Sequence, residues 1–188
     1  RTQVYRFDSY QIISIANLEG YYYRPRTDME LLKEHHEGLI CLSSCVNGYI
    51  SEPLLRNQEE TAKKRAETLS EIFGKDNFYL ELQKHINLNE QDVLNEKLIK
   101  LSEKLGIPLV ATNDNHYVHS SDAQAQEILL CIQTQTTIGT PNRKLSMISS
   151  PDFYIKTQEE MVGLFIQTPA AIENTVRIAD MCNVDITL

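Results

Sequence analysis

The sequence predicts an α/β fold, because short apolar runs alternate with segments of helical periodicity between residues 38 and 112. Elements in the order strand, helix, strand, helix, strand require parallel strands joined by right-handed crossovers. Three parallel strands do not close a barrel, and they leave exposed edges. The segment is therefore either part of a small open sheet or a fraction of a larger barrel, and we favour the fraction.

The three strands are predicted from short runs rich in apolar, branched or aromatic residues. They cover residues 38–43, 78–82 and 107–112. The third carries Pro108 near its beginning, where a strand tolerates proline. Periodicity alone does not separate the first run from a buried helical turn, so its assignment depends on the alternation around it.

Two helices join these strands, and each has a start signal and a stop signal. Asn57 is the expected cap of the first, with Glu60 three residues later, and Gly74 is its stop. Asn89 is the expected cap of the second, and Gly106 ends it.

Further helices are expected on both sides of this core. Two short ones, near residues 12–18 and 28–35, precede the first strand. After the third strand, a helix begins at Ser120 or Ser121 and is followed by an irregular loop over residues 134–151. Two more helices finish the chain, and their start signals are the pairs Thr157 with Glu160 and Thr168 with Pro169.

Composition and charge narrow the functional classes. Of the 188 residues, 41% are apolar and 23% are charged, which is typical of a globular domain and excludes a disordered or fibrous chain. The net charge of -8 repels phosphate unless basic residues gather on one face. We therefore do not expect this chain to bind free nucleic acid by itself.

The sequence has neither a membrane-spanning apolar run nor a secretory signal at its start, so we expect a cytoplasmic protein without a membrane partner. Its first methionine is Met29, which leads us to expect a segment of a longer chain or a processed product. The four cysteines include no CxxC pair, so we expect reduced thiols.

Residues that can bind metal follow each predicted strand. Cys45 follows the first strand, His85 the second, and Asp114 and His116 the third. The carboxyl ends of parallel strands converge, so a thiolate, a carboxylate and two imidazoles can meet there, and these types suit zinc or a similar divalent ion. If the backbone is extended, Asp114 and His116 project to the same side.

Each of these residues also has a simpler interpretation. Asp114 could cap a turn while His116 makes a local hydrogen bond, and Cys45 could be a small buried apolar residue, although its neighbours form a polar loop. His85 could lie on the surface, and Glu81 could be solvated or support the site. Residues 21–26 could form a basic aromatic patch that binds nucleic acid, but we expect a packed turn.

Three segments carry a resemblance to a known family. They are residues 37–45 (EGLICLSSC), 78–85 (FYLELQKH) and 106–117 (GIPLVATNDNHY). They resemble the PHP (polymerase and histidinol phosphatase) domain of bacterial DNA polymerase III alpha subunits, the C-family replicative DNA polymerases. Residues 19–26, 129–134 and 150–154 are similar to the same family, so the resemblance extends from about residue 10 to the end.

The resemblance implies a distorted (β/α)7 barrel that holds up to three metal ions, with zinc or manganese in the PHP site. It implies that Cys45, Asp114 and His116 are metal ligands and that Glu81 and His85 are supporting residues. The opening His-x-His motif of the family has no counterpart here, so the chain supplies an incomplete site. Ser44 stands where glycine is common in the family.

The resemblance also implies a division of the chain, with residues 1–133 as the C-terminal part of the PHP domain and residues 134–188 as a helical connector toward the polymerase palm. The parent would be a DNA-directed DNA polymerase that uses magnesium and palm carboxylates outside this chain, and the fragment alone is expected to be inactive. Its PHP site would perform a proofreading-type, 3′–5′ exonuclease reaction.

Its partners would be the remainder of the alpha subunit, a proofreading exonuclease subunit, and DNA through the parent protein. Two alternatives stay open. The domain could be a non-catalytic scaffold that docks the exonuclease, or the chain could be a free-standing PHP phosphoesterase.

Overall fold

The computed structural model describes residues 5–182, which form eight α-helices, one 3-10 helix and three strands. In chain order they are α1 (Tyr5–Leu18), α2 (Met29–Glu34), β1 (Cys41–Leu42), α3 (Ser51–Leu55), α4 (Glu59–Phe73), β2 (Phe78–Gln83), α5 (Asn89–Leu105), β3 (Leu109–Thr112), η1 (Ser120–Asp122), α6 (Ala123–Thr134), α7 (Gln158–Leu164) and α8 (Pro169–Met181). None of the helices in this part of the chain is long and apolar enough to cross a membrane.

The strands form one parallel sheet in the order β1-β2-β3, which confirms the predicted α/β class. Cys41 pairs with Phe78 at one side of β2, and Leu80 pairs with Leu109 at the other. All six residues of β2 are buried, as expected for a central parallel strand that is covered on both faces.

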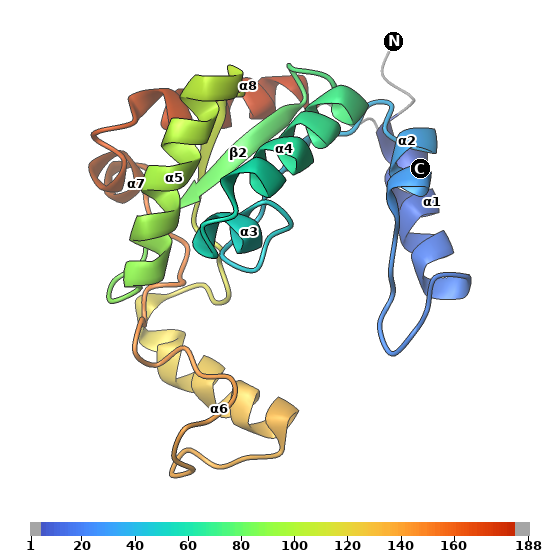
Figure 1. Cartoon of the computed structure of the whole chain (residues 1–188). Helices are drawn as coiled ribbons and strands as arrows, with labels where there is room; N and C mark the ends of the chain where they lie inside the picture. Colours follow the sequence, from blue (N-terminus) through green and yellow to red (C-terminus); the bar gives the residue numbers. More distant parts are fainter. Residues whose placement is uncertain (1–4, 183–188) are drawn as a thin grey trace, which may run out of the picture.

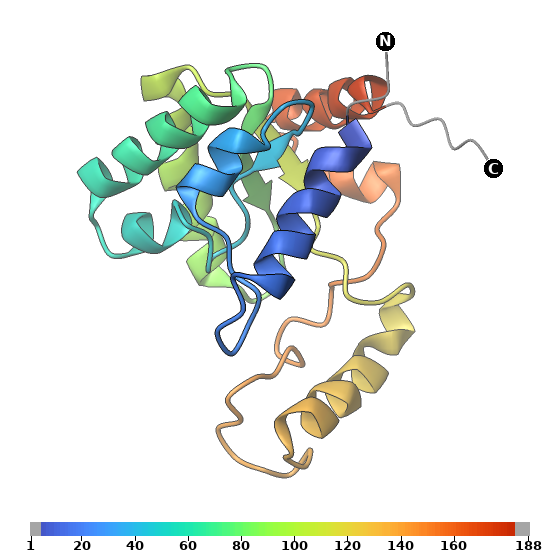
Figure 2. The ribbon, with the colours of Figure 1, turned by 90° about the vertical axis from the view of Figure 1, so that its right-hand side faces the viewer.

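Helices cover both faces of the sheet. Helices α4 and α5 lie on one side of β2, and α8 packs against β3 from the other side (Figures 1 and 2). Their apolar faces meet in one core that includes Phe78, Leu98 and Ala171, each fully buried. Helix α8 therefore shares its core with the sheet.

Two segments extend from this body. Helices α1 and α2 stand together at one side, joined by the loop over residues 19–28 (Figure 1). Helix α6 and the irregular segment after it form an arm that projects below the sheet in both views (Figures 1 and 2). A buried pair between Glu127 and Arg143 holds this arm together internally.

The helix stop signals are confirmed, but the two predicted asparagine caps are wrong. Gly74 and Gly106 both have positive φ, at 83° and 65°, a conformation that glycine adopts without steric cost. Helix α4 begins after Gln58, because Asn57 has φ 58° and belongs to the turn that follows α3. Asn89 lies within the first turn of α5.

Start signals in the second half of the chain are partly confirmed. Thr157 and Glu160 form the predicted reciprocal capping box of α7, and Thr168 with Pro169 begins α8. The helix expected from Ser120 begins as the 3-10 turn η1 and continues as α6. Helix α3 was not predicted, since five residues are too few for a periodic signal.

Candidate functional site

The loop after β1 places Cys45 in a tight turn. Gly48 donates its main-chain N–H to the Cys45 carbonyl at 2.8 Å. A Cβ at Gly48 would lie 2.4 Å from the Ser43 carbonyl oxygen, so the loop has no space for a larger residue there. Ser44 has φ 68°, a left-handed conformation that glycine adopts more readily. The serine therefore adopts a backbone conformation that favours glycine.

Glu81 connects this loop to the two neighbouring strands. Its buried carboxylate accepts hydrogen bonds from the Ser44 main-chain N–H at 3.0 Å, the Gln83 side chain at 2.9 Å and the Thr112 hydroxyl at 2.5 Å. The interpretation of Glu81 as a solvated side chain is therefore wrong. The contacts place an acid between the cysteine loop and the end of β3.

The negative charge of Glu81 affects the pKa of a neighbouring thiol, that of Cys41. Burial, together with the Glu81 carboxylate, raises the pKa of Cys41 to about 11. Both effects disfavour an additional negative charge at this place. A cation near the strand ends would be favoured by the same carboxylate. All four cysteines are free thiols, as expected.

The loop after β3 differs from the extended chain that the sequence suggested. Asp114 has φ 47°, so the alternation of side chains along a strand does not apply across residues 114 to 116. Instead, His116 Nδ1 lies 2.6 Å from the Asp114 carbonyl oxygen. Because a carbonyl only accepts, Nδ1 is the donor in this contact, so in the neutral imidazole the lone pair lies on Nε2. This tautomer is the one that a metal bound at Nε2 requires.

His85 is buried, so its interpretation as a surface residue is wrong. Its ring stacks on Phe153, with centroids 4.1 Å apart, and its Nδ1 lies 3.5 Å from Asp152 Oδ1. That contact is long for a hydrogen bond, and neither ring nitrogen has a hydrogen-bond partner among the described residues. Burial lowers the pKa of His85, and the Asp152 carboxylate opposes this shift without cancelling it.

The predicted ligands do not gather into a closed cluster. Within residues 5–182, no three His, Cys, Asp or Glu side chains form a group that could hold a metal ion. Asp114 and His116 share one loop and are joined by the contact between the His116 ring and the Asp114 main chain. Cys45 lies on the other side of Glu81, in the β1 loop.

Residues of the irregular segment that follows α6 also reach this region, and the sequence did not identify them as part of a site. Asp152 accepts the Ile86 N–H at 3.0 Å, and Lys156 Nζ donates to Asn113 Oδ1 at 2.7 Å. The side chain of Lys156 is only 5% exposed. No spacing signal announces these contacts, because about forty residues or more separate the partners.

The tyrosine-rich loop does not form the packed turn that we expected. Tyr21 and Tyr22 are each 62% exposed, and Tyr23 is 80% exposed. Tyr22 and Tyr23 meet edge to face, and the Arg26 guanidinium lies 5.0 Å from the Tyr22 ring centre. These local contacts fix the turn while leaving its rings in solvent.

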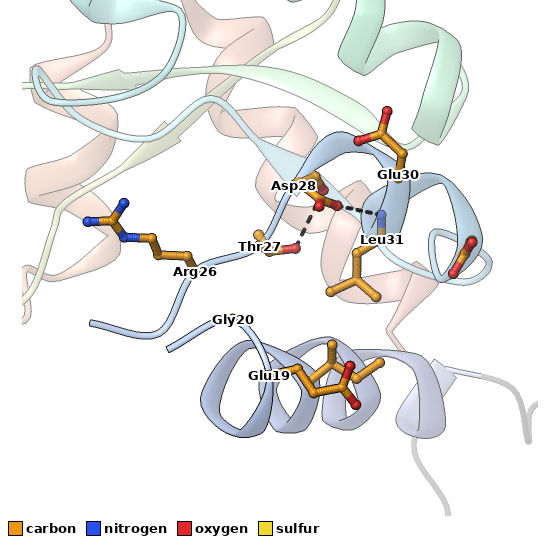
Figure 3. A pocket seen from close by; sticks show the side chains of 9 residues that line it. Glu19, Gly20, Arg26, Thr27, Asp28, Glu30 and Leu31 are labelled. Carbon is orange, nitrogen blue, oxygen red and sulfur yellow. Dashed lines mark hydrogen bonds between the residues drawn. The ribbon is translucent and has the colours of Figure 1, made fainter. Parts of the chain in front are cut away.

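An open pocket between α1 and α2 lies next to this loop and contains none of the predicted ligands (Figure 3). Its volume is about 410 Å³, and its lining includes Glu19, Glu30 and Glu34. Asp28 caps α2 by accepting the Leu31 N–H at 2.9 Å, so this carboxylate is already used by the fold (Figure 3).

Comparisons with known proteins connect these features to one family. Residues 5–85 match the family model of the PHP domain. The chain is 49% identical over 173 residues to the DNA polymerase III subunit alpha of Borreliella burgdorferi and 46% identical to that of Treponema pallidum, and 92% of the chain is covered in both cases. It is 41% identical to the Thermus aquaticus subunit, with 97% of the chain covered.

The chain spans about 15% of the length of these relatives. The PHP match ends at the last residue of the FYLELQKH segment, and the alignments with the polymerase subunits continue through the Asp114 loop and into the segment after α6. The resemblance predicted from the three segments is confirmed, and the chain corresponds to the PHP region of DNA polymerase III alpha subunits.

Proposed function

We propose that this chain is a segment of a replicative DNA polymerase and contributes to a metal-dependent phosphoesterase site in its PHP domain. The observation that carries the proposal is the alignment of 92% of the chain with one polymerase alpha subunit at 49% identity. The parent would perform DNA-templated synthesis with magnesium. The carboxylates for that reaction would lie outside this chain.

Cys45, Asp114 and His116 are the proposed metal ligands. The Nδ1 contact of His116 with the Asp114 carbonyl leaves Nε2 available, which fits metal binding. These three side chains do not form a closed cluster among the described residues, and three ligands are fewer than a structural zinc site uses, so other segments of the parent would have to complete the site. When bound, zinc or manganese would lower the pKa of a water molecule and polarise a phosphodiester.

Glu81 and His85 are proposed as supporting residues with different tasks. Glu81 holds the cysteine loop through the Ser44 N–H and holds β3 through Thr112. His85 fills the space beneath the loop after β3 by stacking on Phe153. Neither residue needs to touch the metal to fix the geometry of the residues that do.

The three-stranded sheet is compatible with part of a PHP fold, and we propose that it belongs to a distorted (β/α)7 barrel. We also propose the division into a PHP part, residues 1–133, and a connector toward the palm, residues 134–188. The remainder of the alpha subunit, DNA and a proofreading exonuclease are the proposed partners.

Replacement of His116 in the full-length alpha subunit tests the metal site. We expect His116→Ala to reduce bound zinc or manganese, measured by elemental analysis, and to abolish metal-dependent release of nucleotides from a DNA 3′ end. DNA synthesis should persist. His36→Ala is a matched control, because His36 contacts the Lys33 carbonyl in another part of the chain.

Unchanged metal content and hydrolysis in His116→Ala would reject the assignment. If the unmodified subunit holds no stoichiometric metal, the scaffold alternative replaces the phosphoesterase proposal. In that case binding of a proofreading exonuclease would be the property to measure.

A further inference from the structure

We propose that Phe153 is a positioning residue for His116, so that the connector is a working part of the candidate metal site. This inference rests on the proposed function. It adds a residue outside the predicted PHP part, residues 1–133, and assigns it a specific task. The task is to hold the His116 imidazole by its Nδ1 side and ring, so that its Nε2 would stay available to a bound metal ion.

The main chain of the connector pairs with the ligand loop. The Phe153 carbonyl accepts the N–H groups of His116, at 2.8 Å, and Tyr117, at 3.3 Å. In return, the Phe153 N–H donates to the Tyr117 hydroxyl at 3.1 Å. The main chain of His116 is thereby fixed to the residue that its ring also contacts.

The Phe153 ring lies between two imidazoles. It stacks on His85, with centroids 4.1 Å apart and an interplanar angle of 22°. It meets His116 edge to face, with centroids 5.5 Å apart and an angle of 86°. Phe153 is 7% exposed, and the His85 side chain is fully buried. Both rings beneath His116 are therefore held by packing.

His116 is an exposed residue, and these contacts restrain its ring. Its Nδ1 is held by the Asp114 carbonyl and one side of its ring by Phe153. Only Nε2 lacks a role in this arrangement. Fixing a ligand imidazole before the metal binds reduces the entropy that binding must overcome.

Polar contacts keep the connector in place on both sides of Phe153. Asn113 donates to the Tyr154 carbonyl at 2.5 Å and accepts from Lys156 Nζ at 2.7 Å. Asp152 accepts from the Ile86 N–H and from the Ser150 hydroxyl, each at 3.0 Å. The connector is thus tied to the ends of both β2 and β3.

Phe153→Leu in the full-length alpha subunit tests this role, because leucine keeps the apolar character and loses the flat ring. We expect zinc affinity, measured by competition with a chelator, to fall about tenfold, as is typical when a residue that orients a metal ligand is changed. After substitution with cobalt, we expect the absorption spectrum of the bound ion to shift, because the ligand geometry changes.

Phe165→Leu is the matched control. Phe165 is 4% exposed and packs in the core with the sheet and helices. We expect this variant to lose thermal stability but to keep the zinc affinity and the cobalt spectrum. If Phe153→Leu does not fold, Phe153→Met serves as the second variant, because methionine adapts to irregular spaces.

The outcomes separate the two proposals. If Phe153→Leu and Phe153→Met keep the zinc affinity and cobalt spectrum while His116→Ala loses metal, the positioning role is wrong and the metal site stands. If His116→Ala keeps its metal, the proposed site itself is wrong. Equal losses of zinc affinity in Phe153→Leu and Phe165→Leu would show that reduced stability causes the loss, and they would overturn the positioning role.

Discussion

The carboxylate of Glu81 accepts the main-chain N–H of Ser44 at 3.0 Å, which joins the centre of the sheet to the loop that carries Cys45. The same carboxylate accepts the Thr112 hydroxyl at the end of β3. One buried acid therefore sets the separation of two loops that the proposed function requires to cooperate.

Replacing Glu81 with glutamine should loosen the cysteine loop. Glutamine directs an N–H₂ group at sites where Glu81 only accepts, so at least one donor is left without a partner, at a cost of about 1–3 kcal/mol. We expect faster hydrogen exchange of the Ser44 amide, measured by mass spectrometry. The exposed Glu71 on α4 provides the control, and equal protection in Glu81→Gln and Glu71→Gln would contradict this role.

The same substitution should change the chemistry of a thiol. Burial is the larger cause of the raised pKa of Cys41, and the Glu81 charge is the second. Removing that charge should lower the pKa of Cys41 from about 11, while burial keeps it above the ordinary value of 9.0. The pH at which Cys41 reacts with an alkylating reagent, followed by peptide mass spectrometry, should fall in Glu81→Gln. An unchanged pH profile of the alkylation would show that the Glu81 charge does not affect the pKa of Cys41.

Ser44→Gly should stabilise the protein by about 1 kcal/mol, because a non-glycine residue in the left-handed region carries a steric cost of that order. The hydrogen bond from the main-chain N–H to Glu81 is retained in this variant. Ser70→Gly, within α4, should instead destabilise the protein by about 0.5–1 kcal/mol. The midpoint temperature of thermal denaturation should therefore rise in Ser44→Gly and fall in Ser70→Gly. A lower midpoint in Ser44→Gly would show that Ser44 is not strained.

The regular elements could be predicted from the sequence because their signals are local. Alternation over residues 38–112 gives the parallel sheet, and Gly74 and Gly106 mark the ends of α4 and α5. The caps predicted at Asn57 and Asn89 are wrong for different reasons. Asn57 adopts a left-handed turn, which asparagine favours as well as a cap, whereas Asn89 is already the first residue of α5. Tertiary context decides between those two uses.

The site was predictable only in part, for a related reason. Cys45, Asp114 and His116 follow strands, so topology alone places them at one end of the sheet. Phe153 follows no strand, and it reaches His85 and His116 from the irregular segment between α6 and α7. Contacts of this kind depend on how the chain returns after α6, which no local periodicity encodes.

The arm formed by α6 and the following segment should loosen in acid. Burial alone would raise the pKa of Glu127, but donors from Ser146 and Met147, together with Arg143, lower it below its ordinary value. A lowered pKa in the folded state means that the stabilisation is present above the unfolded value of about 4.3 and is lost as the pH falls through the folded value. The protection factor of the Met147 amide against hydrogen exchange, which takes account of the slower intrinsic exchange in acid, should therefore fall as the pH drops below the unfolded value.

The variant Glu127→Gln removes the titrating group and serves as the comparison. Its arm should be less protected at neutral pH, and the dependence on acid should disappear. An acid-dependent loss of protection that survives in Glu127→Gln would assign the effect to another group.

Gly48→Ala should disrupt the cysteine loop more than its small change in volume suggests. The added Cβ would lie 2.4 Å from the Ser43 carbonyl oxygen and 2.9 Å from that of Cys45, and both are main-chain atoms that cannot rotate away. Overpacking of this kind costs about 1–3 kcal/mol. Gly139→Ala is the matched control, because no atom lies within 4 Å of its added Cβ. The midpoint temperature of thermal denaturation and the amount of bound metal should both decrease in Gly48→Ala alone. Equal values in the two variants would show that the loop adapts to the methyl group.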